Sequence, residues 1–386
     1  MATRLLTALI TALLLAGLAP ALGAAEQKKK DFLLRPGENC LSATCHNRLG
    51  KQAFVHAPAA STNAGCLACH KHPDPARHRF ELVAGGSGEM CSQCHENQAT
   101  KEFKHVPVEA GLCTFCHDPH QSNNPKQLKL PATGELCFAC HNPAKFKNEF
   151  THGPVVKGDC LRCHNPHSAD HPHVLEQAVP DLCFGCHNKQ VKREDGDIIV
   201  AVKPTFDNKE LKHHAPFIVG DCKFCHNPHA SSHYRLLNGP YPESFYASYA
   251  PNKYICFNCH AESSHSTPRT LTDTGFRNGN LNLHYRHVNR TKGRTCRACH
   301  DHHAAERPKL IRDKVPFGQR YITIEEFELT ETGGRCTPTC HSEAAYDRYN
   351  PARVSFKVTP RPGVDATPEE LQRTRSSQTT SAQKNN

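Results

Sequence analysis

Residues 105–120 read HVPVEAGLCTFCHDPH, and residues 136–141 read LCFACH. Both stretches contain two cysteines that are separated by two residues and followed at once by a histidine. Nine such motifs occur along the chain: Cys66/Cys69/His70, Cys91/Cys94/His95, Cys113/Cys116/His117, Cys137/Cys140/His141, Cys160/Cys163/His164, Cys183/Cys186/His187, Cys222/Cys225/His226, Cys256/Cys259/His260 and Cys296/Cys299/His300. Two stretched motifs, with four and three residues between the cysteines, are Cys40/Cys45/His46 and Cys336/Cys340/His341. These eleven motifs use all 22 cysteines.

The C-x-x-C-H pattern is the attachment signature of c-type haem. Two closely spaced thiols add to the two vinyl groups of one porphyrin, and the adjacent histidine becomes the proximal iron ligand. A zinc ribbon needs two cysteine pairs per metal and no following histidine, and a disulfide scaffold gives no reason for that histidine. The sequence therefore predicts eleven haem c groups, with nine or ten as the alternative. For the last motif, the alternative is a disulfide between Cys336 and Cys340 beside an idle His341.

The motifs form an internal repeat in which two types alternate. Before a type A motif stands a histidine with a glycine six residues later, as in His105 and Gly111, and most type A motifs have a second histidine three residues after the proximal one, as in His120. A type B motif instead has an apolar residue directly before its first cysteine, as in Leu136. The first cysteines are 22 to 26 residues apart up to Cys183 and 34 to 40 residues apart afterwards.

Each unit of two motifs supplies two additional histidines, which is enough for one distal ligand per haem. Of 29 histidines, 18 remain after the eleven proximal ones. Beyond the N-terminal leader the only methionine is Met90, which adjoins Cys91, so His/Met ligation is not expected. The haems are therefore predicted to be low-potential centres with two histidine ligands. The predicted distal ligands are His56, His72, His105, His120, His152, His167, His214, His229, His284, His287 and His303.

Two of these assignments depart from the repeat. His72 stands beside Pro73, which occupies the regular position, and His284 is assigned to the haem that lacks a regular partner. The seven other histidines are His78, His171, His173, His213, His233, His265 and His302. Most of them are expected to be solvated.

Residues 1–25 are typical of a secretory signal peptide. Arg4 provides the positive charge, residues 5–18 the apolar run, and small residues around Ala25 the cleavage site. The apolar run is short for a membrane span, and an uncleaved anchor is the alternative. The chain is predicted to be exported to the periplasm, the outer membrane or the outside of the cell, without an integral membrane span.

The composition excludes a large aliphatic core, since the chain has no tryptophan, two methionines and 37% hydrophobic residues. About 33 residues per haem are too few to wrap each porphyrin separately, so the porphyrins must pack against one another and form the core. The predicted fold class is a multihaem cytochrome c, mostly coil with short helices and little sheet, arranged as a linear haem-packed repeat array. Helical turns are expected after each motif, and a short hairpin at residues 321–324.

Four parts are predicted along the chain. They are a signal peptide at 1–25, closely spaced haem repeats at 26–213, wider-spaced repeats with insertions at 214–345, and a disordered tail at 346–386. Residues 234–254 contain five tyrosines. We expect them to pack over porphyrin edges, and a docking surface for a partner is the alternative.

The formal net charge of +10 would by itself suggest nucleic acid or an anionic membrane as a partner. Eleven haems would bring 22 propionates, however, so the basic side chains are better explained as propionate partners. The interleaved aromatic residues of a single-strand nucleic-acid groove are also missing. No nucleic-acid partner is expected.

The alternation of His-x-Pro-x-x-x-Gly-x-Cys-x-x-Cys-His-x-Pro-His with Leu-Cys-Phe-x-Cys-His resembles the doubled-motif multihaem c-type cytochromes. The likeness covers residues 40–345. That family includes periplasmic decahaem components of porin–cytochrome conduits and small electron carriers of nitrite and metal reduction. The resemblance implies an electron carrier in anaerobic respiration whose partners are redox proteins, among them an outer-membrane porin and other multihaem cytochromes. The eleventh motif, the two stretched spacers and the C-terminal insertions depart from the decahaem pattern.

Two other functions fit the same haem density. A multihaem reductase of small nitrogen or sulfur compounds would need one iron with an open position. Multihaem nitrite reductases often mark that haem by a lysine in place of the histidine, whereas all eleven motifs here end in histidine. An extracellular haem filament is the third possibility, which a linear repeat permits but does not require. No catalytic residues are predicted.

Overall fold

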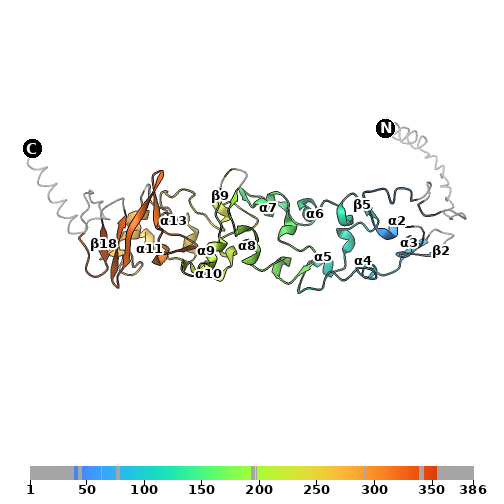
Figure 1. The fold of residues 1–386 in the computed structure, drawn as a ribbon, viewed down its shortest axis with the longest axis horizontal. Helices are drawn as coiled ribbons and strands as arrows, with labels where there is room; N and C mark the ends of the chain where they lie inside the picture. Colours follow the sequence, from blue (N-terminus) through green and yellow to red (C-terminus); the bar gives the residue numbers. More distant parts are fainter. Residues whose placement is uncertain are drawn as a thin grey trace, which may run out of the picture.

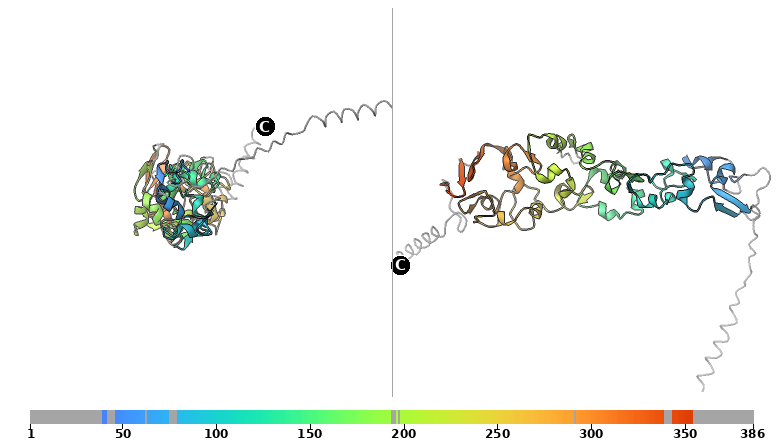
Figure 2. Two further views of the ribbon diagram at one scale, coloured as in Figure 1. Left: turned by 90° about the vertical axis from the view of Figure 1, so that its right-hand side faces the viewer. Right: turned by 90° about the horizontal axis from the view of Figure 1, so that it is seen from below.

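The computed structural model describes residues 39–353, apart from 42–45, 62, 75–78, 193–195, 197, 291 and 339–342. The predicted signal peptide, most of the predicted tail, and Cys45, His78, Cys340 and His341 lie outside the described residues. The described chain forms an elongated rod, with the first motifs at one end and the last at the other (Figure 1). Viewed down its long axis, the rod has a compact cross-section (Figure 2).

Short helices connected by coil make up most of the rod. The α-helices are α2 (Ala57–Ala60), α3 (Asn63–Leu67), α4 (Ser87–Cys91), α5 (Val106–Glu109), α6 (Gly134–Phe138), α7 (Gly153–Val156), α8 (Asp181–His187), α9 (Lys203–Asp207), α10 (Ala215–Val219), α11 (Ser263–Ser266), α12 (Leu283–Val288) and α13 (Cys296–Cys299). The 3₁₀-helices are η2 (Cys113–Phe115), η3 (Pro125–Gln127), η4 (Pro143–Phe146), η5 (Cys160–Arg162), η6 (Pro172–Val174), η7 (Cys222–Phe224), η8 (Tyr234–Leu236), η9 (Ile255–Asn258) and η10 (Pro308–Leu310). The fold class predicted from the sequence is confirmed. Helical turns were expected after each motif, but many of them contain the motif cysteines themselves, because the short spacer is itself one turn.

The His-x-Pro-x-x-x-Gly stretch before a type A motif forms a helix with a defined start and end. His105 caps α5 in an extended conformation, and Pro107 follows in the first turn, where its missing N–H costs nothing. The helix is over by Gly111, whose φ of +67° favours glycine. Gly158 and Gly220 have the same left-handed conformation, at +71° and +78°. The repeat therefore places its histidine at a fixed helix start.

Four pairs of two-residue antiparallel strands join units that are far apart in sequence. They are β1 (Phe54–Val55) with β5 (Gln121–Ser122), β4 (Phe103–Lys104) with β7 (Ser168–Ala169), β6 (Phe150–Thr151) with β11 (Ala230–Ser231), and β10 (Lys212–His213) with β14 (Ala304–Ala305). We call these pairs strand links. In each link, one strand directly precedes the histidine that stands before a type A motif. The other strand directly follows the second histidine of a type A motif, three residues after the proximal one.

Three further hairpins are local, namely β2 (His70–Asp74) with β3 (Arg79–Leu82), β8 (Val191–Lys192) with β9 (Ile198–Ile199), and β12 (Arg277–Asn278) with β13 (Leu281–Asn282). The C-terminal end carries one larger antiparallel sheet. Its strands are β15 (Lys314–Phe317), β16 (Arg320–Leu329), β17 (Gly333–Pro338) and β18 (Ala344–Asp347), in that order.

The expected hairpin at residues 321–324 is present as part of β15 and β16, and the sheet extends beyond it. Ile322 pairs with Val315, and Val315 and Ile324 are buried. At Gly333 an added Cβ would lie 1.9 Å from the Tyr346 carbonyl oxygen, so β17 and β18 can approach only because glycine stands there. Long-range pairing of this kind leaves little local signal in a sequence.

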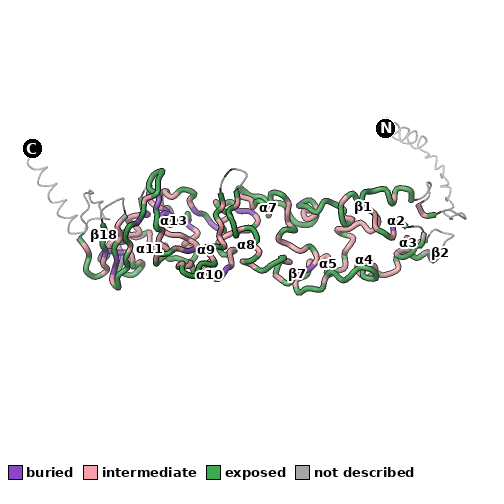
Figure 3. The backbone as a smooth tube through the Cα atoms, in the orientation of Figure 1, coloured by how far each residue is buried: buried purple, intermediate pink, exposed green. Residues whose placement is uncertain are grey.

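Buried apolar side chains are few, as the composition predicts. Among the described residues they concentrate towards the C-terminal half, around α11 and α13 (Figure 3). Tyr241 and Tyr254 belong to this cluster and pack edge to face, with ring centroids 5.6 Å apart. The tyrosine-rich segment at residues 234–254 therefore packs inward at these two positions. None of the described helices is both long and apolar enough to cross a membrane.

Candidate haem-binding sites

The described structure brings nine motif histidines next to a predicted distal histidine. The ring centroids of these pairs lie 5.8 to 6.5 Å apart. With the motif histidine first, the pairs are His70/His120, His95/His56, His117/His167, His141/His105, His164/His229, His187/His152, His226/His303, His260/His214 and His300/His284. In seven pairs the ring planes are within 22° of parallel. His226/His303 and His300/His284 are tilted by 43° and 36°.

The spacing within these pairs fits one haem iron between two imidazoles. An imidazole nitrogen lies about 2 Å from a bound metal, so two rings on opposite sides of one iron have centroids about 6.3 Å apart. The observed distances bracket that value. Two nitrogen donors facing each other across such a gap, beside a pair of cysteines, are the donor set that c-type haem requires.

Eight of the eighteen paired histidines have a hydrogen bond at Nδ1, which leaves Nε2 as the nitrogen available to a metal. In four type A motifs, Nδ1 of the motif histidine lies 2.8 to 3.0 Å from the carbonyl oxygen nine residues later. These contacts are His117 to Lys126, His164 to His173, His226 to Arg235 and His300 to Lys309. A hydrogen bond of this kind on the far nitrogen fixes the tautomer and raises the basicity of a metal-bound imidazole.

The acceptor carbonyls belong to residues in an unusual backbone conformation. Lys126, His173, Arg235 and Lys309 have φ between +56° and +61°, and the residue after each is also left-handed. We call these four segments the left-handed turns. Such φ values cost non-glycine residues about 1–2 kcal/mol each. Their recurrence at the same place in four units shows that the turn is tied to the site, since strained backbone persists where its surroundings impose it.

The strand links hold the distal histidines of different motifs together. The backbone N–H of His56 donates to the carbonyl of His120 at 2.8 Å, although His56 pairs with His95 and His120 pairs with His70. The same bond joins His105 to His167, His152 to His229 and His214 to His303, each at 2.9 Å. Each link therefore fixes the distal side of two haem sites at once.

A second contact in each link orients one ring. Nδ1 of His56, His105 and His152 lies 2.8 to 3.0 Å from the carbonyl oxygen of Pro119, Pro166 and Pro228, respectively. In the fourth link, His302 stands at the proline position and its carbonyl serves His214. This position explains why His302, which was expected to be solvated, has its Nε2 buried.

The cysteines of consecutive motifs also lie together, in sequence order. Burial and the Cys160 thiol raise the pKa of Cys137 to about 11, and burial together with the Cys113 thiol raises the pKa of Cys91. Equivalent interactions connect successive motifs from Cys69 to Cys296: Cys69–Cys91, Cys91–Cys113, Cys116–Cys140, Cys137–Cys160, Cys163–Cys186, Cys183–Cys222, Cys225–Cys256 and Cys256–Cys296. The nine regular motifs thus follow one another along the rod without a gap.

The two cysteines of a motif are not equally enclosed, although the sequence prediction treats them alike. The second cysteine of every regular type B motif is exposed, while the other described cysteines are half-buried. The four exposed ones are Cys94, Cys140, Cys186 and Cys259. Their assignment as haem-attaching residues stays a prediction.

The physical reason for this difference is a cover that only type A motifs have. After each left-handed turn the chain folds back, and the backbone N–H of the residue thirteen positions after the second cysteine donates to the carbonyl of that cysteine. These bonds, 2.8 to 2.9 Å long, are Lys129 to Cys116, Glu176 to Cys163, Asn238 to Cys225 and Arg312 to Cys299. No such bond reaches the carbonyl of Cys94 or Cys259 within the described part of the chain. A haem at a type B motif would therefore have one attached edge near the surface of the rod.

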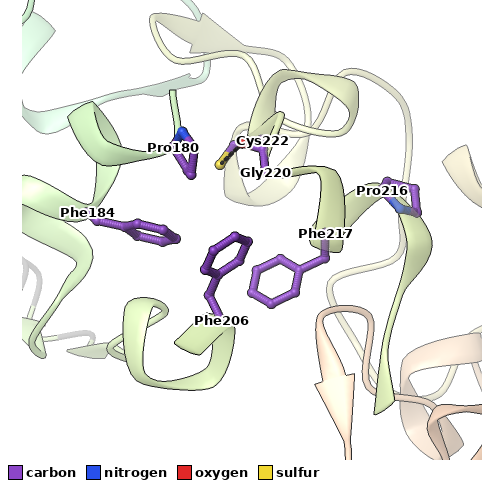
Figure 4. Close-up of a pocket in the computed structure, with 7 residues that line it drawn as sticks. All are labelled: Pro180, Phe184, Phe206, Pro216, Phe217, Gly220 and Cys222. Atoms are coloured by element: carbon purple, nitrogen blue, oxygen red, sulfur yellow. Dashed lines mark hydrogen bonds between the residues drawn. The ribbon is translucent and has the colours of Figure 1, made fainter. Parts of the chain in front are cut away.

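An apolar pocket opens between two of these motifs (Figure 4). It is small, with a volume of about 20 Å³, and is lined by Pro180, Phe184, Phe206, Pro216, Phe217, Gly220 and Cys222. Phe206 comes from α9, in the long interval between the motifs at Cys183 and Cys222, and packs on Phe184 and Phe217 with centroids 5.0 and 5.4 Å apart. An apolar wall beside a motif cysteine suits the edge of a porphyrin.

The remaining predicted ligands are less fully defined. His46 is described, but its cysteine partner Cys45 is not, and nothing is described for His341 or for the side chain of His72. Nδ1 of His287 donates to the Leu283 carbonyl at 2.7 Å, and the His287 ring lies against Phe276. The assignments of these four histidines stay predictions.

The left-handed turns were missed by sequence reasoning, yet a signal for them exists. In all four units, an aliphatic residue stands eleven positions after the motif histidine and pairs with it as a β-bridge. These bridges are His117 with Leu128, His164 with Leu175, His226 with Leu237 and His300 with Ile311.

Sequence reasoning also treated His265 as a solvated side chain. In the structure its ring lies against His284, and burial lowers the pKa of His265 to about 4 and that of His284 to about 3.

Comparison with known proteins agrees with this arrangement. The family model described as the doubled CXXCH motif matches residues 105–146, 152–192 and 214–265. Each matched region contains one type A motif followed by one type B motif.

A stretch of 120 residues is 28% identical to a protein named multiheme cytochrome MtrA from Shewanella baltica (strain OS185). The match covers 29% of this chain and 34% of that protein, so the chain spans about a third of the length of this curated relative. In its motifs, in their pairing in the fold and in these matches, the chain is similar to the doubled CXXCH multihaem c-type cytochromes.

Proposed function

We propose that this protein is an electron carrier that passes electrons along a linear succession of haems, each held by two histidines. The observation that carries this proposal is the sequence-ordered series of nine histidine pairs with neighbouring cysteines. At family level the function is electron transfer by bound haem c. The proposal adds the order of the sites, their axial ligands and their number, which is eleven if both stretched motifs bind haem.

The chain's own residues perform three tasks in this proposal. Cysteines fix each porphyrin covalently, paired histidines close both axial positions, and the carbonyls at Nδ1 hold the imidazoles in one tautomer. The haem, when bound, supplies reversible one-electron chemistry. A haem held by such a pair would have a histidine on each side of its iron, which would leave a small substrate no open position at the nine paired sites. This favours a carrier over a reductase.

The electrostatics favour low potentials. Histidine on both sides stabilises ferric iron more than methionine does, and the Nδ1 hydrogen bonds increase that effect. The only methionine among the described residues is Met90, next to Cys91.

We further propose a location and partners. Residues 1–25 read as a signal peptide, and the matched relative is named a multiheme cytochrome. The chain would then work outside the inner membrane, taking electrons from periplasmic redox proteins and delivering them to an outer-membrane or extracellular acceptor. Other multihaem cytochromes and an outer-membrane porin are the proposed partners.

The proposal is tested by quantifying haem per chain and recording the electron paramagnetic resonance spectrum of the oxidised protein. Nine to eleven haems, all low-spin, are expected. A high-spin signal equal to one haem per chain would overturn the carrier proposal and favour a reductase with one open iron. Co-purification of the tagged chain with a barrel protein tests the porin partnership separately.

A further inference from the structure

Three imidazoles meet at the site of the Cys296/Cys299/His300 motif. His284, on α12, has its ring centroid 6.5 Å from that of His300. His265, on α11, has its ring centroid 4.5 Å from that of His284, and the His300 imidazole also acts on it electrostatically. Among the paired sites that the structure describes, only this one has a third, unpaired histidine whose ring centroid lies within 4.5 Å of that of the distal ring.

The rings of His265 and His284 are held by side-chain hydroxyl groups. Nδ1 of His265 contacts the Ser264 hydroxyl at 2.5 Å, and Nδ1 of His284 contacts the Thr274 hydroxyl at 2.9 Å. In each strand link, one distal ring is instead anchored on a backbone carbonyl, which cannot rotate. Nε2 of neither His265 nor His284 is engaged by a hydrogen bond within the described part of the chain. Both rings therefore present a donor nitrogen and have a rotatable anchor.

Packing keeps His265 and His284 together. The side chain of Asn282, which has no exposed surface, donates to the carbonyls of Ser264 and Thr267 at 3.0 and 2.9 Å. Asn282 also caps α12, where its side chain accepts from the Tyr285 N–H. One buried amide thus ties α11 to the start of α12. Phe257 packs on His265 and Phe276 on His284, which encloses the pair.

We propose that His265 is a second axial ligand for the haem at the Cys296/Cys299/His300 motif, able to replace His284 opposite His300. This inference rests on the proposed function, since it requires haem at that motif. Replacement of one ligand by the other breaks one iron–nitrogen bond and forms another. Both imidazoles are neutral donors, so the exchange needs no electron and no net proton.

The test uses the full haem-loaded protein and four variants: His265→Ala, His284→Ala, the double variant, and His152→Ala. His152 is the matched control, because its ring pairs with His187 and is anchored on a backbone carbonyl. Haem per chain is measured first, and the high-spin signal of the oxidised protein is then integrated against it. The inference predicts that His265→Ala and His284→Ala both stay low-spin, whereas the double variant and His152→Ala each gain one high-spin haem per chain.

A gain of one high-spin haem in His284→Ala alone would overturn the inference while leaving the carrier proposal intact. A wild-type protein with fewer than nine haems would overturn the proposed function itself. If His284→Ala loses haem, His284→Asn replaces it as a variant of more similar volume, and the same two outcomes apply.

Discussion

The rings of Phe217 and His303 lie face to face, with centroids 4.8 Å and planes 27° apart. Phe217 is the third residue after His214. The corresponding residues after His56, His105 and His152 are Ala59, Val108 and Val155. In the three units with a small residue, the type A pairs are tilted by 15°, 20° and 22°, whereas His226 and His303 are tilted by 43°. We infer that the phenyl ring turns His303 away from the common orientation.

Replacing Phe217 by valine should therefore change one haem spectroscopically. Twisting two axial imidazoles away from parallel raises the largest g-value of a low-spin ferric haem, so Phe217→Val should lower it for a single haem. Phe217→Tyr keeps the ring and serves as the control. The reciprocal variant Val155→Phe should raise the largest g-value of a different haem. Identical spectra for wild type and Phe217→Val would contradict the positioning role.

The left-handed turn at Lys126 should tune a haem potential. Proline cannot adopt a φ of +59°, so Lys126→Pro should move the carbonyl away from His117. Loss of this hydrogen bond makes the imidazole a weaker donor, and the potential of that haem should rise. Redox titration followed by optical spectroscopy would show one component shifted to positive potential.

Lys126→Gly is the matched control for that experiment, because glycine accepts the same φ without strain. Its redox titration should superimpose on that of the wild type. An equal shift in both variants would point to loss of the lysine charge as the cause.

Gly220 should be intolerant of a side chain. Its φ is +78°, and a Cβ there would lie 3.0 Å from Pro180 in the wall of the apolar pocket. We expect Gly220→Ala to lower the stability by about 1–2 kcal/mol, mainly through the left-handed backbone. Thermal unfolding followed by circular dichroism measures the effect. Gly153→Ala, where an added Cβ meets nothing within 4 Å, should change the melting temperature little.

The C-terminal sheet should weaken in acid through Asp347. Its carboxylate accepts from the backbone N–H groups of Asn350 and Tyr349 at 2.7 and 2.8 Å and from the Thr332 hydroxyl, and these bonds hold its pKa below the ordinary 3.8. A depressed pKa in the folded state stabilises the fold above pH 3.8, and that contribution is lost as the pH falls through the folded value.

Hydrogen exchange of β17 and β18 would follow this loss. Protection should fall below pH 3.8 in the wild type, whereas Asp347→Asn should show weaker protection at neutral pH and a smaller dependence on pH. Equal profiles for the two proteins would contradict a role for the carboxylate.

The sequence was most informative where chemistry depends on short spacings. The cysteine pairs, the motif histidines and the His-x-Pro starts of α5, α7 and α10 all follow from neighbouring residues. Partners could not be assigned, because His229 meets His164 only after a strand link joins residues around position 151 to residues around position 230. The role of His265 was missed for the same reason: its neighbour His284 lies nineteen positions away on another helix.

The strand links constrain how such a chain can change in length. Four type A motifs pair with a histidine of the next type A unit, as His164 does with His229, whereas the type B motifs and the last type A motif, at His300, pair with a histidine that comes before them. If these are the axial pairs, a chain cut between two units would leave one type A motif at the new end without its distal histidine. Duplication of a whole unit within the rod would leave every pair complete. Internal duplication of a unit therefore preserves the pairing, whereas a cut between units requires a new partner at the end, as His284 provides for His300.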